Sequence, residues 1–175
     1  MRLLKGTFRT IKGLEDPSFF CIGSSYIEET TKNFVRILYC ENEHWIAVSG
    51  GLDDENISIY DSMKRKSIEN HLAKQLEKMM LQPAIDQSHI IARVRNTQVQ
   101  KKTLCGYFAC AFATALCFSI DIERIKFDTE KLVPHWLKCI NEMKISMFPY
   151  QERIYVDKHP KILKFNKITR ITIGE

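Results

Sequence analysis

The order of apolar and polar positions divides the chain into strand-like and helix-like segments. Short apolar or alternating runs rich in β-branched and aromatic residues predict strands at 34–40, 44–49, 56–61 and 89–94, with a last strand inside 158–170. Apolar positions three or four residues apart predict helices at 1–8, 67–81, 105–118 and 129–143. Because strands and helices fall in separate stretches, the pattern indicates an α+β fold.

Two polar residues lie at matching ends of neighbouring predicted strands. His44 opens the strand 44–49 and Asp61 closes the strand 56–61. If these strands pair antiparallel across a turn at 50–55, both side chains reach the same edge of the sheet. Asp61 could then accept the Nδ1–H of His44 and leave Nε2 free to act on a third group.

Cys105 begins the apolar run CGYFACAFATALC, which predicts a buried helix. A thiol at a helix N-terminus beside an imidazole is a strong nucleophile, and the first backbone N–H groups of such a helix can bind an oxyanion. We expect Cys110, Cys117 and Cys139 to be core residues, because free cysteine behaves as a small hydrophobe. His135 lies within the helix that follows the nucleophile, and we expect it to be structural.

These segments, taken in order, resemble a known family. FVRILYCENEHWIAVSG, ISIYDS, CGYFACAFATALC and FDTEKLVPHWLKC are similar to the cysteine proteases of ubiquitin-like modifiers (SUMO/NEDD8 type), a family that includes the adenoviral protease. The similarity is greatest to the stand-alone protease domains of animal mobile elements. That family carries His-Trp, an acidic residue seventeen positions later, and Gln shortly before Cys-Gly, and the spacing from His44 to Asp61 is seventeen here. The resemblance covers about residues 10–150.

The resemblance implies a papain-like fold, with a central, mostly antiparallel sheet flanked by helices and the nucleophile at a helix N-terminus. It implies a Cys105–His44–Asp61 triad, without a cofactor, in a thiol protease of the deSUMOylase or deneddylase kind. Such an enzyme cuts the peptide or isopeptide bond after the C-terminal glycine of a modifier. A glutamine amide completes the oxyanion hole in the family, and Gln98 and Gln100 both remain open for that role. Trp45 and Gly106 are the expected substrate-binding residues.

The chain departs from the family pattern near the nucleophile. Leu104 stands where family members carry Asp, and Lys101 and Lys102 replace small or glycine residues. Two other functions therefore stay open. One is a catalytically weak or inactive binding module for a ubiquitin-like or mobile-element protein, and the other is an acetyltransferase that uses the same triad.

Length and composition indicate the number of domains and the cellular compartment. At 175 residues we expect one catalytic domain spanning 1–175, with a core at about 10–150 and a basic tail at 151–175. Six cysteines without a secretory signal or a C-x-x-C pair favour reduced thiols, hence the nucleus or cytoplasm. We expect no metal site, because the histidines are scattered singly, and no membrane span, because the longest apolar run is too short. The oligomeric state stays open.

The net charge of +5 comes from a few clusters of bases. They lie at Lys64–Lys66, at Lys101–Lys102 and within 158–170, around apolar positions. Such clusters support weak, salt-sensitive binding of a nucleic acid or another polyanion. They fit the acidic patch of a ubiquitin-like modifier or of a polyprotein substrate equally well.

Overall fold

The computed structural model describes residues 1–17, 34–40, 43–50, 57–63, 69–79, 89–95, 97–100, 103–153 and 161–166. Several expected features lie outside these residues. They are residues 51–55 of the expected turn at 50–55, the first two residues of the expected helix at 67–81, and the basic clusters at Lys64–Lys66 and Lys101–Lys102.

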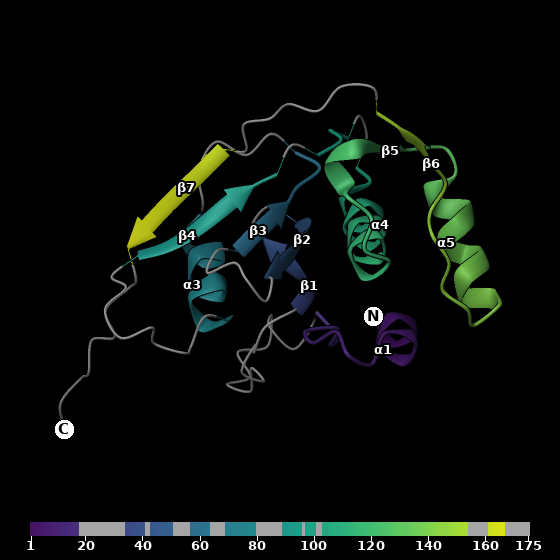
Figure 1. Cartoon of the computed structure of the whole chain (residues 1–175), viewed down its shortest axis with the longest axis horizontal. Helices are drawn as coiled ribbons and strands as arrows, with labels where there is room; N and C mark the ends of the chain where they lie inside the picture. Colours follow the sequence, from purple (N-terminus) through teal and green to yellow (C-terminus); the bar gives the residue numbers. More distant parts are fainter. Residues whose placement is uncertain are drawn as a thin grey trace.

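The main sheet of the described residues has five strands in the order β1-β2-β3-β4-β7 (Figure 1). The strands are β1 Phe34–Cys40, β2 His44–Gly50, β3 Ile57–Tyr60, β4 His89–Val94 and β7 Lys161–Asn166. β1, β2 and β3 pair antiparallel, β4 runs parallel to β3, and β7 is antiparallel to β4. The fold is α+β with a mostly antiparallel sheet flanked by helices, which confirms the expected class.

Alternation along the strands gives the sheet two apolar faces. Leu38, Ile46 and Ile59 pack on one face against Leu72 and Leu76 of α3, Asn70–Met79. The opposite face, which includes Ile37, Ala47 and Tyr60, packs against α4, Cys105–Cys117. The start of α4 is therefore held by a packed core.

α4 is apolar around its whole circumference because other elements surround it. α1, Arg2–Thr7, covers one side, and α5, Leu132–Asn141, lies along another (Figure 1). A second, two-stranded sheet of β5, Ile125–Phe127, and β6, Tyr150–Glu152, joins this layer after the short 3₁₀ helix η1, Ile122–Arg124. The pattern of apolar residues did not predict β5 or β6, which have three residues each.

A buried arginine fastens the N-terminal segment to the sheet. Arg36 on β1 donates from Nη2 to Glu15 Oε2 at 2.8 Å and from Nε to the Gly13 carbonyl at 3.3 Å. Gly13 has a φ of +81°, and a Cβ there would lie 2.9 Å from the Val35 carbonyl oxygen, so only glycine fits. Burial acts to raise the pKa of Glu15, but hydrogen bonds and charge from Arg36 and Lys5 lower it overall. The segment around 13–17 is thus fixed beside α4.

The predicted helices keep their places, with small differences at those ends that the structure describes. The segment 129–143 forms a helix only over Leu132–Asn141, with Pro134 in its first turn, where its missing N–H costs nothing. None of the described helices combines the length and the apolar character that crossing a bilayer requires.

Candidate functional site

A buried histidine–carboxylate pair lies at one edge of the main sheet. His44 Nε2 lies 2.6 Å from Asp61 Oδ1, and the two side chains are 7% and 1% exposed. The Met63 backbone N–H also donates to Asp61 Oδ1, at 2.8 Å, and the Thr97 hydroxyl donates to the Asp61 carbonyl. The antiparallel hairpin therefore brings both residues together at the edge that the sequence indicates.

The ring nitrogen in this contact is Nε2, whereas the sequence led us to expect Nδ1. The β2–β3 register pairs Ala47 with Tyr60, so its continuation sets Asp61 opposite Ile46, two positions from His44. Such a diagonal separation is larger than that of a directly opposite pair, so it takes the far nitrogen of the imidazole to span it. Nδ1 is the nitrogen left for other chemistry.

Cys105 lies at the N-terminus of α4, half-buried, beside the turn that leads into β2. Its Sγ donates to the carbonyl of Glu43, the residue before His44, at 3.8 Å. Glu43 itself adopts a left-handed conformation with a φ of 55°. Among the described residues, the Cys105 thiol makes this hydrogen bond and makes none to the His44 imidazole.

Leu104 stands at the cap position of α4 and offers no side-chain hydrogen bond to it. Its carbonyl accepts from Phe108 N at 2.9 Å, and its side chain packs against the apolar cluster around Phe108 and Phe112. At the position where the resembling family carries Asp, Leu104 therefore packs against the core and gives α4 no side-chain cap. The first-turn N–H groups still give the helix start a partial positive charge.

The two candidate glutamines have different surroundings. Gln98 is buried, and both ends of its amide bind Phe127: Nε2 donates to the carbonyl at 3.1 Å and Oε1 accepts from the N–H at 2.7 Å. Gln100 is half-buried, its Oε1 accepts from Ser62 Oγ at 3.2 Å, and its N–H donates to the Ser62 carbonyl at 2.8 Å. Ser62 thereby orients the Gln100 amide and leaves Nε2 without a partner among the described residues.

A cavity of about 490 Å³ opens beside Cys105. Trp45 and Gly106, both expected on substrate grounds, line it together with Cys105. A Cβ on Gly106 would lie 3.7 Å from Trp45 Cδ1, which is ordinary contact, so the missing side chain leaves open space rather than relieving a clash. An edge contact with Tyr39, at 4.9 Å between ring centroids, holds Trp45 in place.

Sequence reasoning missed several residues around this cavity. Trp136 on α5 forms a second aromatic wall, and Met1 and Pro17 complete the cavity from the N-terminal segment. Glu43 and Ser62, the partners of the thiol and of Gln100, were also not predicted. Only Ser62 had a signal, because it directly follows Asp61 in the Tyr-Asp-Ser motif.

A second thiol–imidazole pair lies apart from this site. Cys139 Sγ is 3.4 Å from His135 Nε2, which also lies 3.1 Å from the Ser146 carbonyl oxygen, and the His135 ring packs on Phe148. The cluster is internal to α5 and the loop after it. His135 thus makes the packing contacts of a structural residue, as expected.

Within the described residues, no group of three or more His, Cys, Asp or Glu is placed to hold a metal ion. Among the described residues, Cys40, Cys105, Cys110, Cys117 and Cys139 form no disulfide. Burial raises the pKa of the Cys117 thiol to about 12 and also raises that of Cys110.

Comparison with known proteins gives a distant structural likeness only. No family model and no curated protein matches the chain. Two solved structures of the SUMO protease Ulp1, with the catalytic cysteine oxidised to a sulfonic or a sulfenic acid, align with TM-scores of 0.45 and 0.44 at 14% identity. Each alignment covers 57% of this chain and 47% of the Ulp1 chain, so this chain spans about half the length of the structures it matches.

Proposed function

We propose that this protein is a cysteine peptidase in which Cys105 is the nucleophile, His44 the general base and Asp61 the residue that orients it. The observation that carries the proposal is the buried His44–Asp61 pair, 2.6 Å apart, directly beside the helix start that carries the Cys105 thiol. A nucleophile, a base and a group that orients the base are the three parts that covalent acyl transfer requires.

The first step uses Nδ1 of His44, because Nε2 is engaged by Asp61. The thiol exchanges between the Glu43 carbonyl and the imidazole, where its proton moves to Nδ1, and the entry of substrate favours the position beside the imidazole. Apo active sites often have loose hydrogen bonds that tighten in the complex, so the contact of the thiol with Glu43 suits a resting state. Asp61 stabilises the imidazolium that results.

The oxyanion hole combines the Cys105 backbone N–H with Nε2 of Gln100. Sγ attacks the scissile carbonyl carbon and the carbonyl oxygen becomes an oxyanion, which these two donors bind. Gln100 suits the role because Ser62 holds its Oε1 and leaves Nε2 as a donor, whereas both ends of the Gln98 amide are bound to Phe127. We therefore assign Gln100 to catalysis and Gln98 to structure.

The reaction then returns the enzyme to its starting state. The tetrahedral intermediate collapses, the C–N bond breaks, and His44 gives its proton to the leaving amine. A water molecule attacks the thioester with His44 again as base. The carboxylic acid product leaves and Cys105 is restored as a thiol.

The proposed substrate is the peptide or isopeptide bond after the C-terminal glycine of a ubiquitin-like modifier, or the corresponding bond within a polyprotein. This class comes from the resemblance of the His-Trp, Tyr-Asp-Ser and Cys-Gly motifs to proteases of such modifiers. The cavity beside Cys105 is consistent with it, because Trp45 and the bare backbone of Gly106 suit a chain that itself lacks side chains.

A panel of modifiers with electrophilic C-termini tests both the nucleophile and the substrate class. Ubiquitin, SUMO and NEDD8 proteins ending in a propargylamide should be incubated with the wild type and with Cys105→Ala. We expect a covalent adduct with at least one modifier, mapped to Cys105 and absent from the variant. An adduct at another cysteine would contradict the assignment of the nucleophile.

A second candidate function is a binding module that recognises the modifier without cutting it. The observation that favours it is the thiol's hydrogen bond to Glu43 in place of a thiol–imidazole contact. In the same experiment this function predicts a stable, non-covalent complex with the modifier and no adduct in the wild type.

A further inference from the structure

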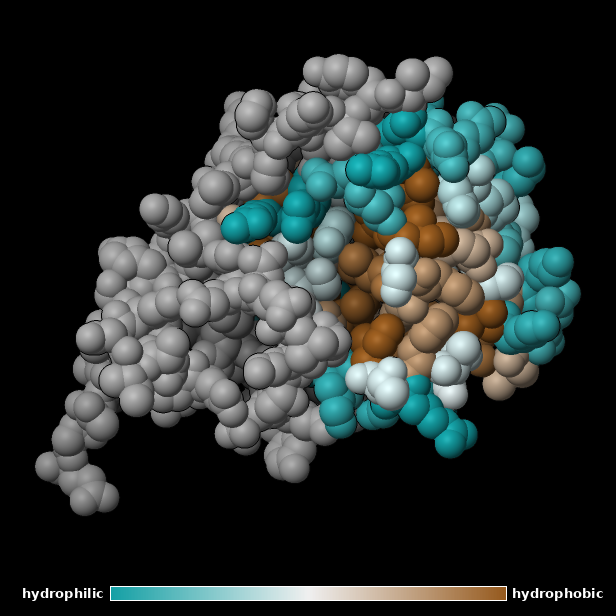
Figure 2. Space-filling view, in the orientation of Figure 1, coloured by the Kyte–Doolittle hydropathy of each residue, from teal (hydrophilic) through white to brown (hydrophobic). Residues whose placement is uncertain are grey.

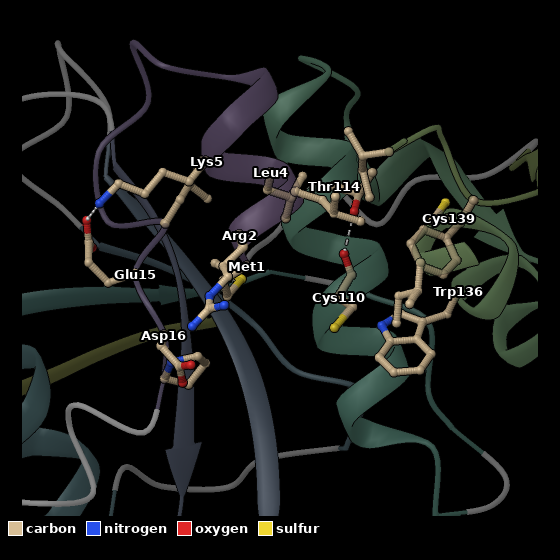
Figure 3. Close-up of a pocket in the computed structure, with 16 residues that line it drawn as sticks. Met1, Arg2, Leu4, Lys5, Glu15, Asp16, Cys110, Thr114, Trp136 and Cys139 are labelled. Atoms are coloured by element: carbon tan, nitrogen blue, oxygen red, sulfur yellow. Dashed lines mark hydrogen bonds and ion pairs between the residues drawn. The ribbon is translucent and has the colours of Figure 1, made fainter. Parts of the chain in front are cut away.

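We propose that a second cavity, between α1, α4 and α5, is a specificity subsite for a bulky apolar group on the substrate. The proposal deepens the peptidase function and rests on Cys105 being its nucleophile. This cavity measures about 530 Å³, within the range of pockets that bind small ligands. Its walls include Leu4 of α1, Cys110 and Thr114 of α4, and Trp136 and Cys139 of α5 (Figure 3).

The second cavity is a neighbour of the one beside Cys105. Met1, Pro17, Cys110 and Trp136 line both cavities. Cys110 follows Cys105 by five residues on the same helix, which corresponds to a rise of roughly 7.5 Å. A group attached two residues from the scissile carbonyl could therefore reach past Trp136 while the carbonyl lies at Cys105.

Several polar groups of the wall are already paired, and Arg2, which also lines the cavity, is exposed. The Thr114 hydroxyl donates to the Cys110 carbonyl at 2.8 Å, and Lys5 pairs with Glu15 at 3.3 Å, both contacts drawn in Figure 3. The Cys139 thiol contacts His135. These groups offer a ligand few new hydrogen bonds, so an apolar group gains most from this site.

The thiols in the wall behave as apolar surface. Burial raises the pKa of Cys110, and this effect outweighs those of the N-terminal amine and of a hydrogen bond from Trp136. The thiol therefore stays neutral at physiological pH. Figure 2 shows apolar surface gathered over the region of α4 and α5 with hydrophilic residues around it, as expected where an apolar group enters.

Two substitutions on α5 provide a matched pair for the test. Ile140 lines the second cavity and not the one beside Cys105, and it is 39% exposed, so Ile140→Trp fills the subsite without disturbing the core. Leu137 is 48% exposed on the same helix and lines neither cavity. Leu137→Trp therefore controls for adding an exposed tryptophan to α5.

The reagents are two chloroacetyl-glycine amides with the same reactive group. The amide nitrogen carries a methyl group in one reagent and a naphthylmethyl group in the other. The glycine is the spacer that lets this group reach the second cavity while the chloroacetyl group lies at Cys105. Labelling of Cys105 is followed by mass spectrometry, and kinact/KI is measured for each reagent. We expect the wild type to prefer the naphthylmethyl reagent about tenfold, since burial of an aromatic ring stabilises its complex.

Ile140→Trp should bring this preference close to one, and Leu137→Trp should leave it at the wild-type value. A wild-type preference near one, or a full preference in Ile140→Trp, would overturn the subsite. Binding of the neutral fluorophore N-phenyl-1-naphthylamine, followed by its fluorescence, separates this proposal from the peptidase function. If neither reagent labels Cys105, the peptidase fails. In that case the cavity is an apolar binding site without a role in a peptidase, provided that the fluorophore binds the wild type and Leu137→Trp but not Ile140→Trp, and the specificity subsite is overturned.

Discussion

In two places among the described residues a cysteine lies near a histidine, and the surroundings of the two thiols differ. Cys139 and His135 are in direct contact at 3.4 Å, yet the thiol is 2% exposed and no carboxylate is among the partners of the ring. Cys105 instead bonds a carbonyl next to His44, but it opens a helix, borders a cavity, and has beside it an imidazole held by Asp61. The contrast teaches that access, an orienting carboxylate and a helix N-terminus define a nucleophile better than a short S–N distance.

The largest effect expected is that of removing the thiol itself. Cys105→Ala should abolish peptide or isopeptide cleavage and leave the melting temperature nearly unchanged, since a half-buried thiol at a helix start packs little. Cys139→Ala should keep the wild-type kcat on a substrate without a bulky apolar group and lose about 1 kcal/mol of stability, because it leaves a small space in the core. If Cys139→Ala were the inactive variant instead, the choice of Cys105 over Cys139 as the nucleophile would be wrong.

Substitution of His44 should affect catalysis, and substitution of His135 should affect stability. His44→Ala should lower kcat/KM nearly as much as loss of Cys105, because within the described part of the chain His44 is the base proposed to act on the thiol. Asp61→Asn should cost less, since an amide oxygen can still accept from Met63 and the base remains. His135→Ala should lower the free energy of unfolding by about 1–3 kcal/mol and leave kcat/KM within about twofold of the wild type. Steady-state kinetics and denaturant unfolding of all three variants measure these effects; wild-type kinetics in Asp61→Asn would require another orienting acid.

The two glutamines extend the comparison with smaller effects. Gln100→Ala should lower kcat by about 10²-fold, the typical cost of one oxyanion donor. Gln98→Ala should instead destabilise the protein, because it leaves the Phe127 backbone without two hydrogen bonds. Equal and small rate effects in both variants would mean that backbone N–H groups alone bind the oxyanion.

The sequence predicted those parts of the site that depend on local patterns. Strand composition in 44–49 and period-two alternation in 56–61 indicated the hairpin, and the hairpin brought His44 to Asp61. The polar-to-apolar change at Cys105 indicated the start of α4. These features follow from residues that are close in the chain or directly paired.

What the sequence did not predict depends on packing between distant elements. The ring nitrogen of His44 follows from an offset of two residues across the hairpin. The choice between Gln98 and Gln100 turns on β5, a three-residue strand with no clear pattern of its own. The walls contributed by Met1, Pro17 and Trp136 come from the N-terminal segment and from α5. The extent of the catalytic domain, the modifier and the role of the basic tail stay predictions.

Alkylation of the folded protein tests the central claim, that Cys105 is the activated thiol, without a known substrate. The protein is treated with iodoacetamide at about pH 6, where ordinary thiols react slowly, and each cysteine is mapped by mass spectrometry over time. Cys105 should be modified first, and His44→Ala should slow that reaction and no other. Cys139 should stay unmodified despite its histidine, as should Cys117, whose pKa of about 12 keeps it protonated. A Cys105 that reacts no faster than Cys139, or as fast in His44→Ala as in the wild type, would contradict the account.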